Sequence, residues 1–581
     1  MLSRRQQTTL ALTGVAAVAV ACYLGALRGG FVWDDLVLAD GSGIGGGDSV
    51  ATCFRTAFLD HYYRPLVSLS FYLDRLWWPG NPEAYHWVNI VLHALGAVAT
   101  SLLVCEAIGR RSLGIIAGVL FAVHPAHVGA VAWIGGRTDA LGCLWTALFA
   151  WTLVGAAGRR SDARAPWLAA SVTAYGLAVF TKEQSLFLLP LVPLAFACFR
   201  PLRGVSLPGD GWFVLGPFAV VAAFYVAIGA FLGMPAPPPL RVSPLDQVAH
   251  FGQSVLGYTE LLLVPSQRPM HSLSLYPWAR ALPWTALAGI LCAGAAVGMV
   301  AFLMRRDRPS AWFLALAVLG LVPVSNLLPL PFLLFAPYRA AVSAIGACAL
   351  LARTLGTLRA DLPGFRAAPA ALACAGAVCW FAIQTLEGIP TFHTEDRLFR
   401  TVLSYDPGAL VAQYMLARSA GAAGRHSEAA GRISAMLARL YSSRAWRRPT
   451  AAHRALARDP AVRARVLQNQ GRRADPAEFV AMLYSQLGYA TMNAGDARGA
   501  VAAFETALGW RPRDPDANYG VAWCYARLGD LVRAETCLRV ALAGKPSAGA
   551  HQLLAEVCER QGRYDEARLE WLRARDLGAG G

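Results

Sequence analysis

The sequence predicts an all-α protein in which a bundle of membrane-spanning helices is followed by a soluble solenoid of short helices. Hydrophobic residues make up 56% of the 581 residues and charged residues only 15%, and soluble proteins of this size do not bury so much apolar surface. The apolar residues also gather in runs long enough to cross a bilayer. A third observation is a repeat of 34 residues near the C-terminus, which is typical of helical repeat proteins.

The apolar runs predict about eleven transmembrane helices, because each run matches the roughly 20 residues that a span needs. The run 8–27 has no clear cleavage site and is expected to remain as the first span. The run 248–264 carries His250, Gln253 and Glu260, so we expect an interfacial or re-entrant helix there. The eleven predicted spans lie near 8–27, 86–107, 112–131, 139–157, 165–181, 184–199, 211–232, 283–304, 311–328, 332–352 and 368–386.

Arginine clusters in the short loops predict the orientation of the bundle. With the N-terminus inside, every basic loop falls on the cytoplasmic side, as the positive-inside rule requires. The clusters also account for the net charge of +16, so no nucleic-acid partner is expected. The twelve cysteines show no paired spacing and are interpreted as small buried hydrophobes. The basic loops are 108–112, 158–164, 199–204, 305–309 and 353–366.

The remaining polar clusters fall on the opposite, non-cytoplasmic face, and the most prominent is Asp34-Asp35 in the outer loop 28–85. Two adjacent carboxylates at a membrane edge are costly unless a proton, a metal or a cationic partner meets them. They suit two roles, either a general base for an acceptor hydroxyl or a holder of a divalent cation. The sequence does not choose between these roles. Of the two carboxylates, Asp35 is expected to carry the chemistry.

Three cations and a set of imidazoles share this face. Arg64, Arg137 and Lys182 lie near carboxylates and predict a site for a phosphodiester or a pyrophosphate. Each cation has a structural alternative, since arginine near lipid extends to the interface and Lys182 has Glu183 beside it. His86, Asn89 and His93 begin the second span, and His124 and His127 flank a proline. For these residues we expect contacts to a phosphate oxygen or a sugar hydroxyl, because their spacing is weak evidence for zinc.

The C-terminal repeats carry small residues at matching positions, with a large apolar residue between them and a proline at the end. Small residues let two antiparallel helices approach, and proline ends the second helix. This is the tetratricopeptide pattern. A weaker copy is expected near 413–439, and the arginine-rich stretch 441–474 is expected to be a linker or a degenerate repeat. The copies are Gly495, Ala500, Phe504, Ala507 and Pro512, then Gly529, Ala534, Leu538, Ala541 and Pro546, then Gly562, Ala567, Trp571 and Ala574.

Together these motifs resemble the transmembrane and tetratricopeptide-repeat O-mannosyltransferases and their bacterial relatives. The resemblance implies a GT-C fold, the architecture of polytopic glycosyltransferases that take a sugar from a polyprenyl-phosphate carrier on the non-cytoplasmic face. It also implies that Asp34 and Asp35 carry catalysis. The motifs are Phe31-Val-Trp-Asp-Asp35, Tyr63-Arg-Pro-Leu66, Tyr85-His-Trp-Val-Asn89 with His93, His124-Pro-Ala-His127, Gly136-Arg-Thr-Asp139, Lys182-Glu-Gln184 and Ser325-Asn-Leu-Leu-Pro329.

One motif departs from the family. The eukaryotic relatives usually carry a Glu-Arg-Tyr-like segment after the Asn-Leu-Leu-Pro motif, whereas this chain has Ala336-Pro-Tyr-Arg-Ala340. The glutamate is absent, and Arg339 remains as a candidate contact to the donor phosphate. This change puts the identity of the donor in doubt more than the type of reaction.

The leading hypothesis is a membrane glycosyltransferase that moves mannose or another hexose from a polyprenyl-phosphate donor to a protein hydroxyl. Its expected partners are the lipid-linked sugar, membrane lipid, and an acceptor or partner protein on the repeats. We expect a multi-pass protein of a bacterial inner membrane, with residues 1–390 forming the GT-C-like domain, 391–478 a degenerate repeat and linker, and 479–581 the repeats on the non-cytoplasmic side. No cofactor is firmly indicated, and a divalent metal ion stays open.

Two alternatives share this architecture. The chain could be an inactive GT-C-like anchor that displays a repeat scaffold for envelope assembly. It could also be a polysaccharide ligase or polymerase that uses a lipid-linked glycan as donor and a glycan as acceptor. The sequence leaves the sugar, the carrier lipid, the acceptor and the oligomeric state open.

Overall fold

The computed structural model divides the chain into two compact units, one ending at Tyr405 and the other beginning at Asp406. Both units are helical throughout the described residues, apart from an isolated antiparallel bridge between Phe58 and Tyr62. The fold is therefore all-α, as predicted. The structure describes residues 3–45, 49–59, 62–159, 161–199, 210–234, 244–265, 284–328, 335–360, 367–405, 407, 409–442 and 476–578.

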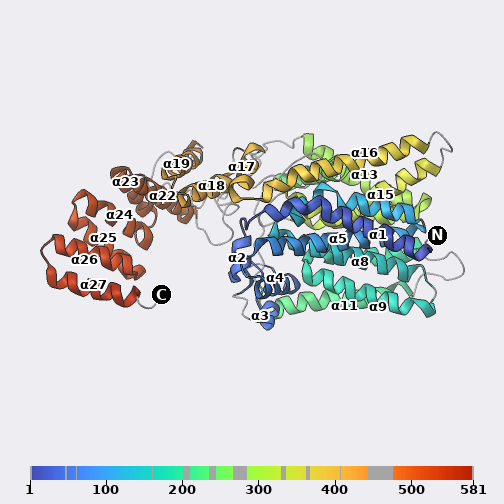
Figure 1. Ribbon diagram of the computed structural model, residues 1–581, viewed down its shortest axis with the longest axis horizontal. Coiled ribbons are helices and arrows are strands. Elements are labelled where there is room, and N and C mark those ends of the chain that lie inside the picture. Colours follow the sequence, from blue (N-terminus) through green and yellow to red (C-terminus); the bar gives the residue numbers. More distant parts are fainter. Residues whose placement is uncertain are drawn as a thin grey trace. The chain divides into compact units, whose positions relative to one another are not determined.

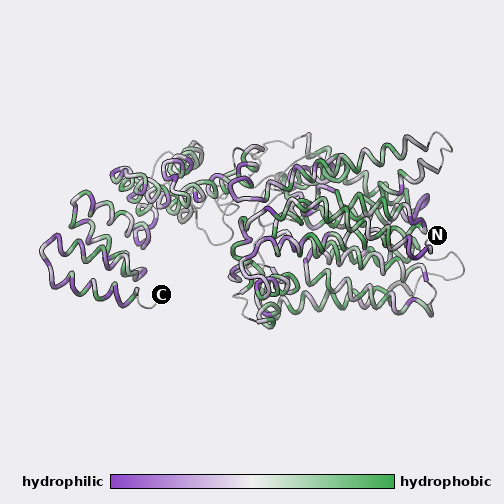
Figure 2. The backbone as a smooth tube through the Cα atoms, viewed as in Figure 1, coloured by the Kyte–Doolittle hydropathy of each residue, from purple (hydrophilic) through white to green (hydrophobic). Residues whose placement is uncertain are grey.

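The first unit is a bundle of long helices with short helices at one end. Figure 1 shows α2, α3 and α4 gathered at the end of the bundle away from the N-terminus, and Figure 2 shows the long helices to be mostly apolar along their length. The helices are α1 (Arg4–Tyr23), α2 (Asp35–Asp40), α3 (Val50–Arg55), α4 (Pro65–Trp77), α5 (Pro82–Ile108), α6 (Arg111–Ala122), α7 (Val128–Val131), α8 (Arg137–Ala157), α9 (Ser161–Thr181), α10 (Leu191–Phe199), α11 (Asp210–Phe231), α12 (Pro244–Leu263), α13 (Trp284–Arg306), α14 (Arg308–Leu321), α15 (Ala341–Ala360), α16 (Ala367–Gly388) and α17 (Glu395–Tyr405).

Within the described residues, seven helices are long and apolar enough to cross a membrane, and an eighth results if one bent pair is a single span. The bend of 48° lies between Arg111–Ala122 and Pro125–Val131, where Pro125 lacks the N–H that a continuous helix needs. The chain is therefore a multi-pass membrane protein.

The remaining predicted spans correspond to helices that are shorter or less apolar. Helix α9 includes Arg164, directly before the predicted span 165–181. Pro190 separates α10 from the 3-10 helix η5 (Glu183–Leu188), and α14 has 14 residues. Proline cannot donate the next backbone hydrogen bond, so it divides the apolar run 184–199 into two short pieces.

The segment between the first and second spans folds onto the end of the bundle through an apolar cluster. Phe71 of α4 is fully buried in that cluster and stacks on Phe58, with ring centroids 6.4 Å apart. The cluster fixes the loop that carries the acidic pair against α5 and α8, because its members come from all of these elements. Its buried members are Leu38, Ile44, Phe58, Val67, Phe71, Tyr85, Ile134 and Leu141.

Helix α12 occupies the run that the sequence predicts to be interfacial or re-entrant, and it is not among the candidate spans found in the described residues. It lies very close to α13, because a Cβ at Gly252 would come within 2.1 Å of the carbonyl oxygen of Ala286. A Cβ at Gly289 would come within 1.7 Å of the carbonyl oxygen of Gly252. These glycines allow the two backbones to touch.

The second unit consists of antiparallel helix pairs, as the repeat pattern predicts. The residues that the pattern places between the helices are buried, among them Ala500, Phe504, Ala534 and Leu538. The turn glycine Gly529 has φ 88°, a left-handed conformation that suits glycine at a helix end. The helices are α18 (Leu410–Ala422), α19 (His426–Ser442), α22 (Pro476–Asn493), α23 (Ala497–Trp510), α24 (Pro515–Leu528), α25 (Leu531–Gly544), α26 (Ala548–Arg560) and α27 (Tyr564–Gly578).

The weaker copy near 413–439 also forms a helix pair, α18 and α19, with Gly424 in the turn at φ 75°. Ala420 and Ala429 are buried together with Ala490 of α22, so this pair packs onto the first clear repeat. Most of the arginine-rich stretch 441–474 lies outside the described residues.

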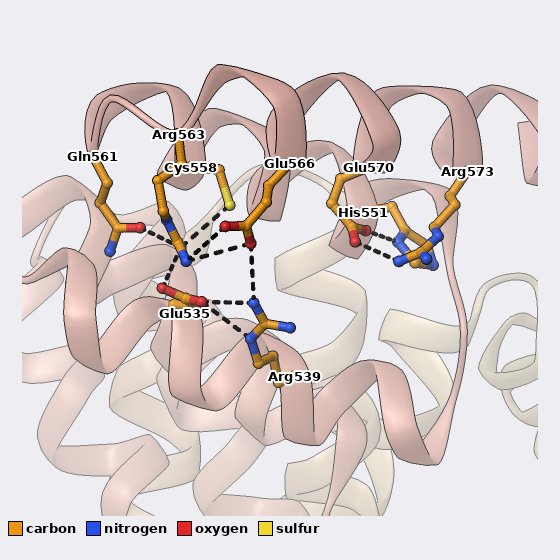
Figure 3. Close-up of polar contacts among 9 residues, drawn as sticks. All are labelled: Glu535, Arg539, His551, Cys558, Gln561, Arg563, Glu566, Glu570 and Arg573. Atoms are coloured by element: carbon orange, nitrogen blue, oxygen red, sulfur yellow. Dashed lines mark hydrogen bonds and ion pairs between the residues drawn. The ribbon is translucent and has the colours of Figure 1, made fainter.

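Ion pairs join the last three helices of the second unit (Figure 3). Glu535 of α25 accepts from Arg539 at 2.8 Å and from Arg563 at 2.5 Å. Glu570 of α27 is mostly buried and lies between Arg573 and His551, at 2.6 and 2.5 Å. These contacts supplement the apolar packing of the repeats.

Candidate functional site

The acidic pair lies where the chain turns into α2. Trp33, directly before the pair, has φ 54°, an uncommon left-handed conformation for a bulky residue. Asp34 is the residue before the helix and Asp35 is its first residue. A strained residue next to two carboxylates is a typical feature of functional sites.

Asp35 is fully buried and both of its carboxylate oxygens accept backbone hydrogen bonds. The N–H of Val32 donates to Oδ2 at 2.9 Å, and the N–H of Gly135 donates to Oδ1 at 2.7 Å. Burial raises the pKa of Asp35 to about 8, even though the two N–H groups favour its ionised form. Asp35 thus ties the loop before α2 to the turn before α8.

Asp34 is partly buried, and within the described residues no hydrogen bond or ion pair reaches its carboxylate. Burial raises its pKa to about 6. Its charge lies within electrostatic reach of Tyr338, which precedes Arg339 in the 3-10 helix η7 (Pro337–Ala340) before α15. The two aspartates therefore differ, because backbone N–H groups hold both oxygens of Asp35, whereas no described residue bonds those of Asp34.

Aromatic rings surround the pair. Trp33 stacks on Trp133 with centroids 5.6 Å apart and planes 16° apart, and Phe399 meets Trp33 edge-on at 6.3 Å. Tyr338 lies 5.6 Å from Trp133. The indole N–H of Trp133 is buried and has no hydrogen-bond partner among the described residues. A hydrogen-bond donor is thus present in this aromatic cluster without a described acceptor.

Arg137 lies fully buried in a network that ties three elements together. Its guanidinium donates to Asn89 at 2.8 Å and to the carbonyl oxygen of Tyr85 at 2.9 Å, and it forms an ion pair with Asp74 of α4. Every guanidinium nitrogen donates to the protein. Asn89 in turn donates to the carbonyl oxygens of Trp133 and Ile134 at 3.1 and 3.3 Å. This arrangement ties Arg137 and Asn89 to neighbouring elements, and the substrate contacts expected of them from the sequence stay a prediction.

Two further ion pairs connect the loops at this end of the bundle. Arg64 donates to both oxygens of Glu183, at 2.9 and 2.5 Å, and its guanidinium lies 3.9 Å from the ring centroid of Tyr62. Burial alone would raise the pKa of Glu183, but the Arg64 guanidinium outweighs it and holds that pKa at about 2. Lys182 donates to Asp139 at 2.5 Å. Lys182 and Glu183 thus have partners on other elements, so they do not pair with each other.

Arg339 lies close to these ion pairs. The charge of Asp139 acts on Arg339 as well as on Arg64, and Tyr62 also lies within electrostatic reach of Arg339. Gln184 donates to the carbonyl oxygen of Arg339 at 3.4 Å. The motifs that contain Arg64, Asp139, Lys182 and Arg339 are therefore brought together by the fold.

The histidines lie deeper in the bundle, inside helix crossings. His93 bonds the carbonyl oxygen of Ala122 at 3.0 Å and lies 4.9 Å, ring to ring, from His127. His124 bonds the carbonyl oxygen of Leu262 at 3.3 Å. His86 is fully buried against Gly29. The ring nitrogens of His86 and Nε2 of His127 are buried without a hydrogen-bond partner among the described residues, and the contacts to a phosphate oxygen or a sugar hydroxyl stay a prediction. Across the described ranges, no group of three or more His, Cys, Asp or Glu side chains is placed to hold a metal ion.

The sequence did not single out Asp74, Trp133, Tyr338 and Phe399. Tyr338 could have been predicted to lie at the site, because it stands between Pro337 and Arg339 in the segment that follows the Asn-Leu-Leu-Pro motif. No sequence pattern indicates a buried role for Asp74, because an acidic residue near a helix end usually faces solvent.

Two tetratricopeptide-repeat family models match residues 492–548 and 533–580. Protein O-mannosyl-transferase Tmtc1 of Drosophila melanogaster is 38% identical over 144 residues, covering 23% of this chain and 17% of the relative. Human Protein O-mannosyl-transferase TMTC3 is 31% identical over 189 residues, covering 30% of this chain and 20% of the relative. Over the matched residues the chain is similar to these protein O-mannosyl-transferases. The matched region spans only about a fifth of the length of these relatives.

Two solved structures are similar to parts of this chain. The archaeal oligosaccharyltransferase AglB from Archaeoglobus fulgidus, in complex with an inhibitory peptide and a dolichol-phosphate, has a TM-score of 0.41 and 14% identity, covering 71% of this chain and 60% of that chain. MamA has a TM-score of 0.24 and 17% identity, covering 34% and 94%.

Proposed function

We propose that this protein is a membrane glycosyltransferase of GT-C type that transfers a hexose from a polyprenyl-phosphate donor to a hydroxyl of an acceptor protein. Two findings support the proposal: the named relatives are protein O-mannosyl-transferases, and the family's motifs meet at one end of the bundle. The observation that carries it is the carboxylate of Asp34, which is partly buried directly after Trp33 and has no hydrogen-bond or ion-pair partner among the described residues.

We assign the general base to Asp34, where the sequence alone favours Asp35. A general base needs an accessible oxygen and a pKa not far below the working pH. Asp34 meets both conditions, since its pKa is raised to about 6 and its oxygens accept no hydrogen bond within the described residues. Asp35 is assigned a positioning role, because the N–H groups of Val32 and Gly135 occupy both of its oxygens.

In the proposed reaction the acceptor hydroxyl oxygen attacks the anomeric carbon of the donor sugar while Asp34 takes the hydroxyl proton. The bond from the anomeric carbon to the phosphate oxygen breaks, and the polyprenyl phosphate leaves with the electron pair. Attack opposite the leaving group inverts the anomeric configuration. Arg339 is assigned to the leaving phosphate, because its cationic side chain lies in the motif after the Asn-Leu-Leu-Pro segment and within electrostatic reach of Asp139 and Tyr62.

We further propose that the site and the repeats face the non-cytoplasmic side of a bacterial inner membrane. The basic loops support this orientation, because positive loops stay in the cytoplasm. The stacked helix pairs of the second unit would then present the acceptor protein, since such solenoids form extended concave surfaces. Residues 1–390 are assigned to sugar transfer and 479–581 to acceptor binding.

The test compares Asp34→Asn with Asp35→Asn in the full-length protein, reconstituted with a polyprenyl-phosphate mannose and a threonine-containing peptide. Asp34→Asn should lower kcat by roughly 10²- to 10⁴-fold, the usual contribution of a general base, and leave thermal stability unchanged. Asp35→Asn should lower stability, because an amide nitrogen cannot accept from a backbone N–H. The matched control is Asp40→Asn, an exposed carboxylate on the same helix, which should keep full activity.

Three results would contradict the proposal. Full activity in Asp34→Asn would remove this carboxylate from the chemistry. Transfer to a glycan acceptor but to no peptide would favour a polysaccharide ligase. Failure of the wild-type protein to transfer sugar from any polyprenyl phosphate, with the fold intact, would favour an inactive anchor for the repeats.

A further inference from the structure

The chain that leaves the last span folds back onto the loop before the acidic pair. After α16, a short 3-10 helix, Ile389–Phe392, leads to His393. The N–H of Gly30 donates to the carbonyl oxygen of His393 at 3.0 Å, and the His393 ring bonds the carbonyl oxygen of Gly25 at 3.0 Å. These two bonds join segments more than 360 residues apart in sequence.

The next helix, α17, contacts Trp33. Leu398, Phe399 and Val402 form its buried face. Phe399 is fully buried, and its ring meets Trp33 edge-on with centroids 6.3 Å apart and planes at 69°. Edge-to-face pairs of this kind are favourable beyond the apolar area that they bury.

Trp33 needs such support because its backbone is strained. A left-handed φ in a bulky residue costs of order 1–3 kcal/mol and persists only where the surroundings enforce it. Two rings hold it: Trp133 stacks on its face, and Phe399 meets its edge. Because Asp34 follows directly, the conformation of Trp33 sets the position of the Asp34 carboxylate.

We propose that Phe399 is a positioning residue for sugar transfer: its ring on α17 holds Trp33 in its left-handed conformation and thereby places Asp34. The inference rests on the proposed function, in which Asp34 is the base. Helix α17, the last helix of the first unit, would thus help to hold the site in place.

The kinetic test uses full-length protein in lipid nanodiscs, with a polyprenyl-phosphate mannose and a threonine-containing peptide. Phe399→Ala should lower kcat by roughly 10- to 100-fold, because small misplacements of catalytic groups have effects of this size. The KM for the donor should stay within about twofold, since the Phe399 ring is fully buried and contacts Trp33. Phe399→Tyr should keep most of the wild-type rate, because it keeps the ring.

Leu398→Ala is the control: it removes a fully buried side chain from the same helix and should keep kcat near the wild-type value.

A double-mutant cycle distinguishes positioning from general stability. If Phe399 acts through Trp33, then Phe399→Ala should lower kcat no further in a Trp33→Ala background. Independent, multiplying effects of the two substitutions would overturn the proposal. An equal loss of kcat in Leu398→Ala would overturn it as well, because the effect would then come from the packing of α17 as a whole.

A second measurement does not depend on activity. With 5-fluorotryptophan incorporated, the ¹⁹F signal of Trp33, assigned by its loss in Trp33→Phe, should shift in Phe399→Ala and stay in place in Leu398→Ala. If the wild-type protein transfers no sugar but this shift occurs, the proposed function fails and the contact between α17 and the loop stands. If transfer occurs and neither kcat nor the Trp33 signal responds to Phe399→Ala, the positioning role is refuted while the function stands.

Discussion

Asp34 and Asp35 are neighbours in sequence but have opposite surroundings. Asp35 accepts from two backbone N–H groups and is fully buried, so it acts as a link between two loops. Asp34 faces the aromatic rings, without a hydrogen-bond partner in the described part of the chain. At the residue scale, the pair therefore combines one structural and one available carboxylate.

The raised pKa of Asp34 predicts the pH dependence of transfer. A base must be ionised to accept a proton, so kcat/KM should rise with pH through about 6, the pKa to which burial raises this carboxyl. A profile measured between pH 4 and pH 8 checks this. A rising limb near 4, the ordinary range for aspartate, would show that a solvated carboxylate is the base.

Buried ion pairs replace free cations at this end of the bundle. Arg137 is paired with Asp74, Arg64 with Glu183, and Lys182 with Asp139. A buried charge without a partner is costly, so each cation brings its own carboxylate. These three cations thus hold the loops of the site in place. Because a carboxylate already neutralises each of them, they add little positive charge for binding a substrate.

At the element scale, the turn between α7 and α8 matters most, because it contacts both α5 and the acidic pair. Asn89 holds its carbonyl groups, and Gly135 presents its N–H to Asp35. The close approach requires glycine: a Cβ at Gly136 would lie 2.0 Å from the carbonyl oxygen of Gly129. The turn therefore has no room for a side chain at this position.

Replacement of this glycine should disturb the site from a distance. Gly136→Ala forces backbone atoms apart and should destabilise the protein by about 1–3 kcal/mol, the usual range for overpacking, and should also lower transfer. The control is Gly142→Ala on α8, where the nearest atom would lie 4.0 Å from the new Cβ. Thermal unfolding in detergent, followed by tryptophan fluorescence, measures both. Equal stability of the two variants would contradict the argument.

At the scale of the whole molecule, the chain consists of two compact units, and every candidate site residue lies in the first, before residue 405. The second unit carries the tetratricopeptide repeats. In the proposed function, sugar transfer therefore belongs to the first unit and the binding of a large acceptor to the second.

A protein truncated after Tyr405 tests this division. It should insert into the membrane and transfer sugar to a short peptide at a rate near that of the full-length protein. Its transfer to a folded acceptor protein should fall, because the proposed binding surface is gone. Rates measured with both acceptors decide the question. Loss of peptide transfer in a truncated protein that still folds would show that the repeats contribute to the chemistry.

The sequence by itself determined the membrane bundle, the repeats and the location of the acidic pair, because hydrophobic runs, the 34-residue period and adjacent carboxylates are local patterns. It did not predict the bend at Pro125 or the division of the run 184–199, although prolines mark both places. These patterns give the type of an element more reliably than its continuity.

Only the tertiary structure decided what each polar residue does. Asp35 is tied by Gly135, and Arg137 is paired with Asp74, across 100 and 63 positions of sequence. Trp33 contacts Phe399, which lies near the C-terminal end of the first unit in sequence. Such partners are set by how the helices pack, and the residue type alone does not reveal whether a charge is already paired. The fold therefore moves the proposed base from Asp35 to Asp34, the carboxylate that packing leaves available.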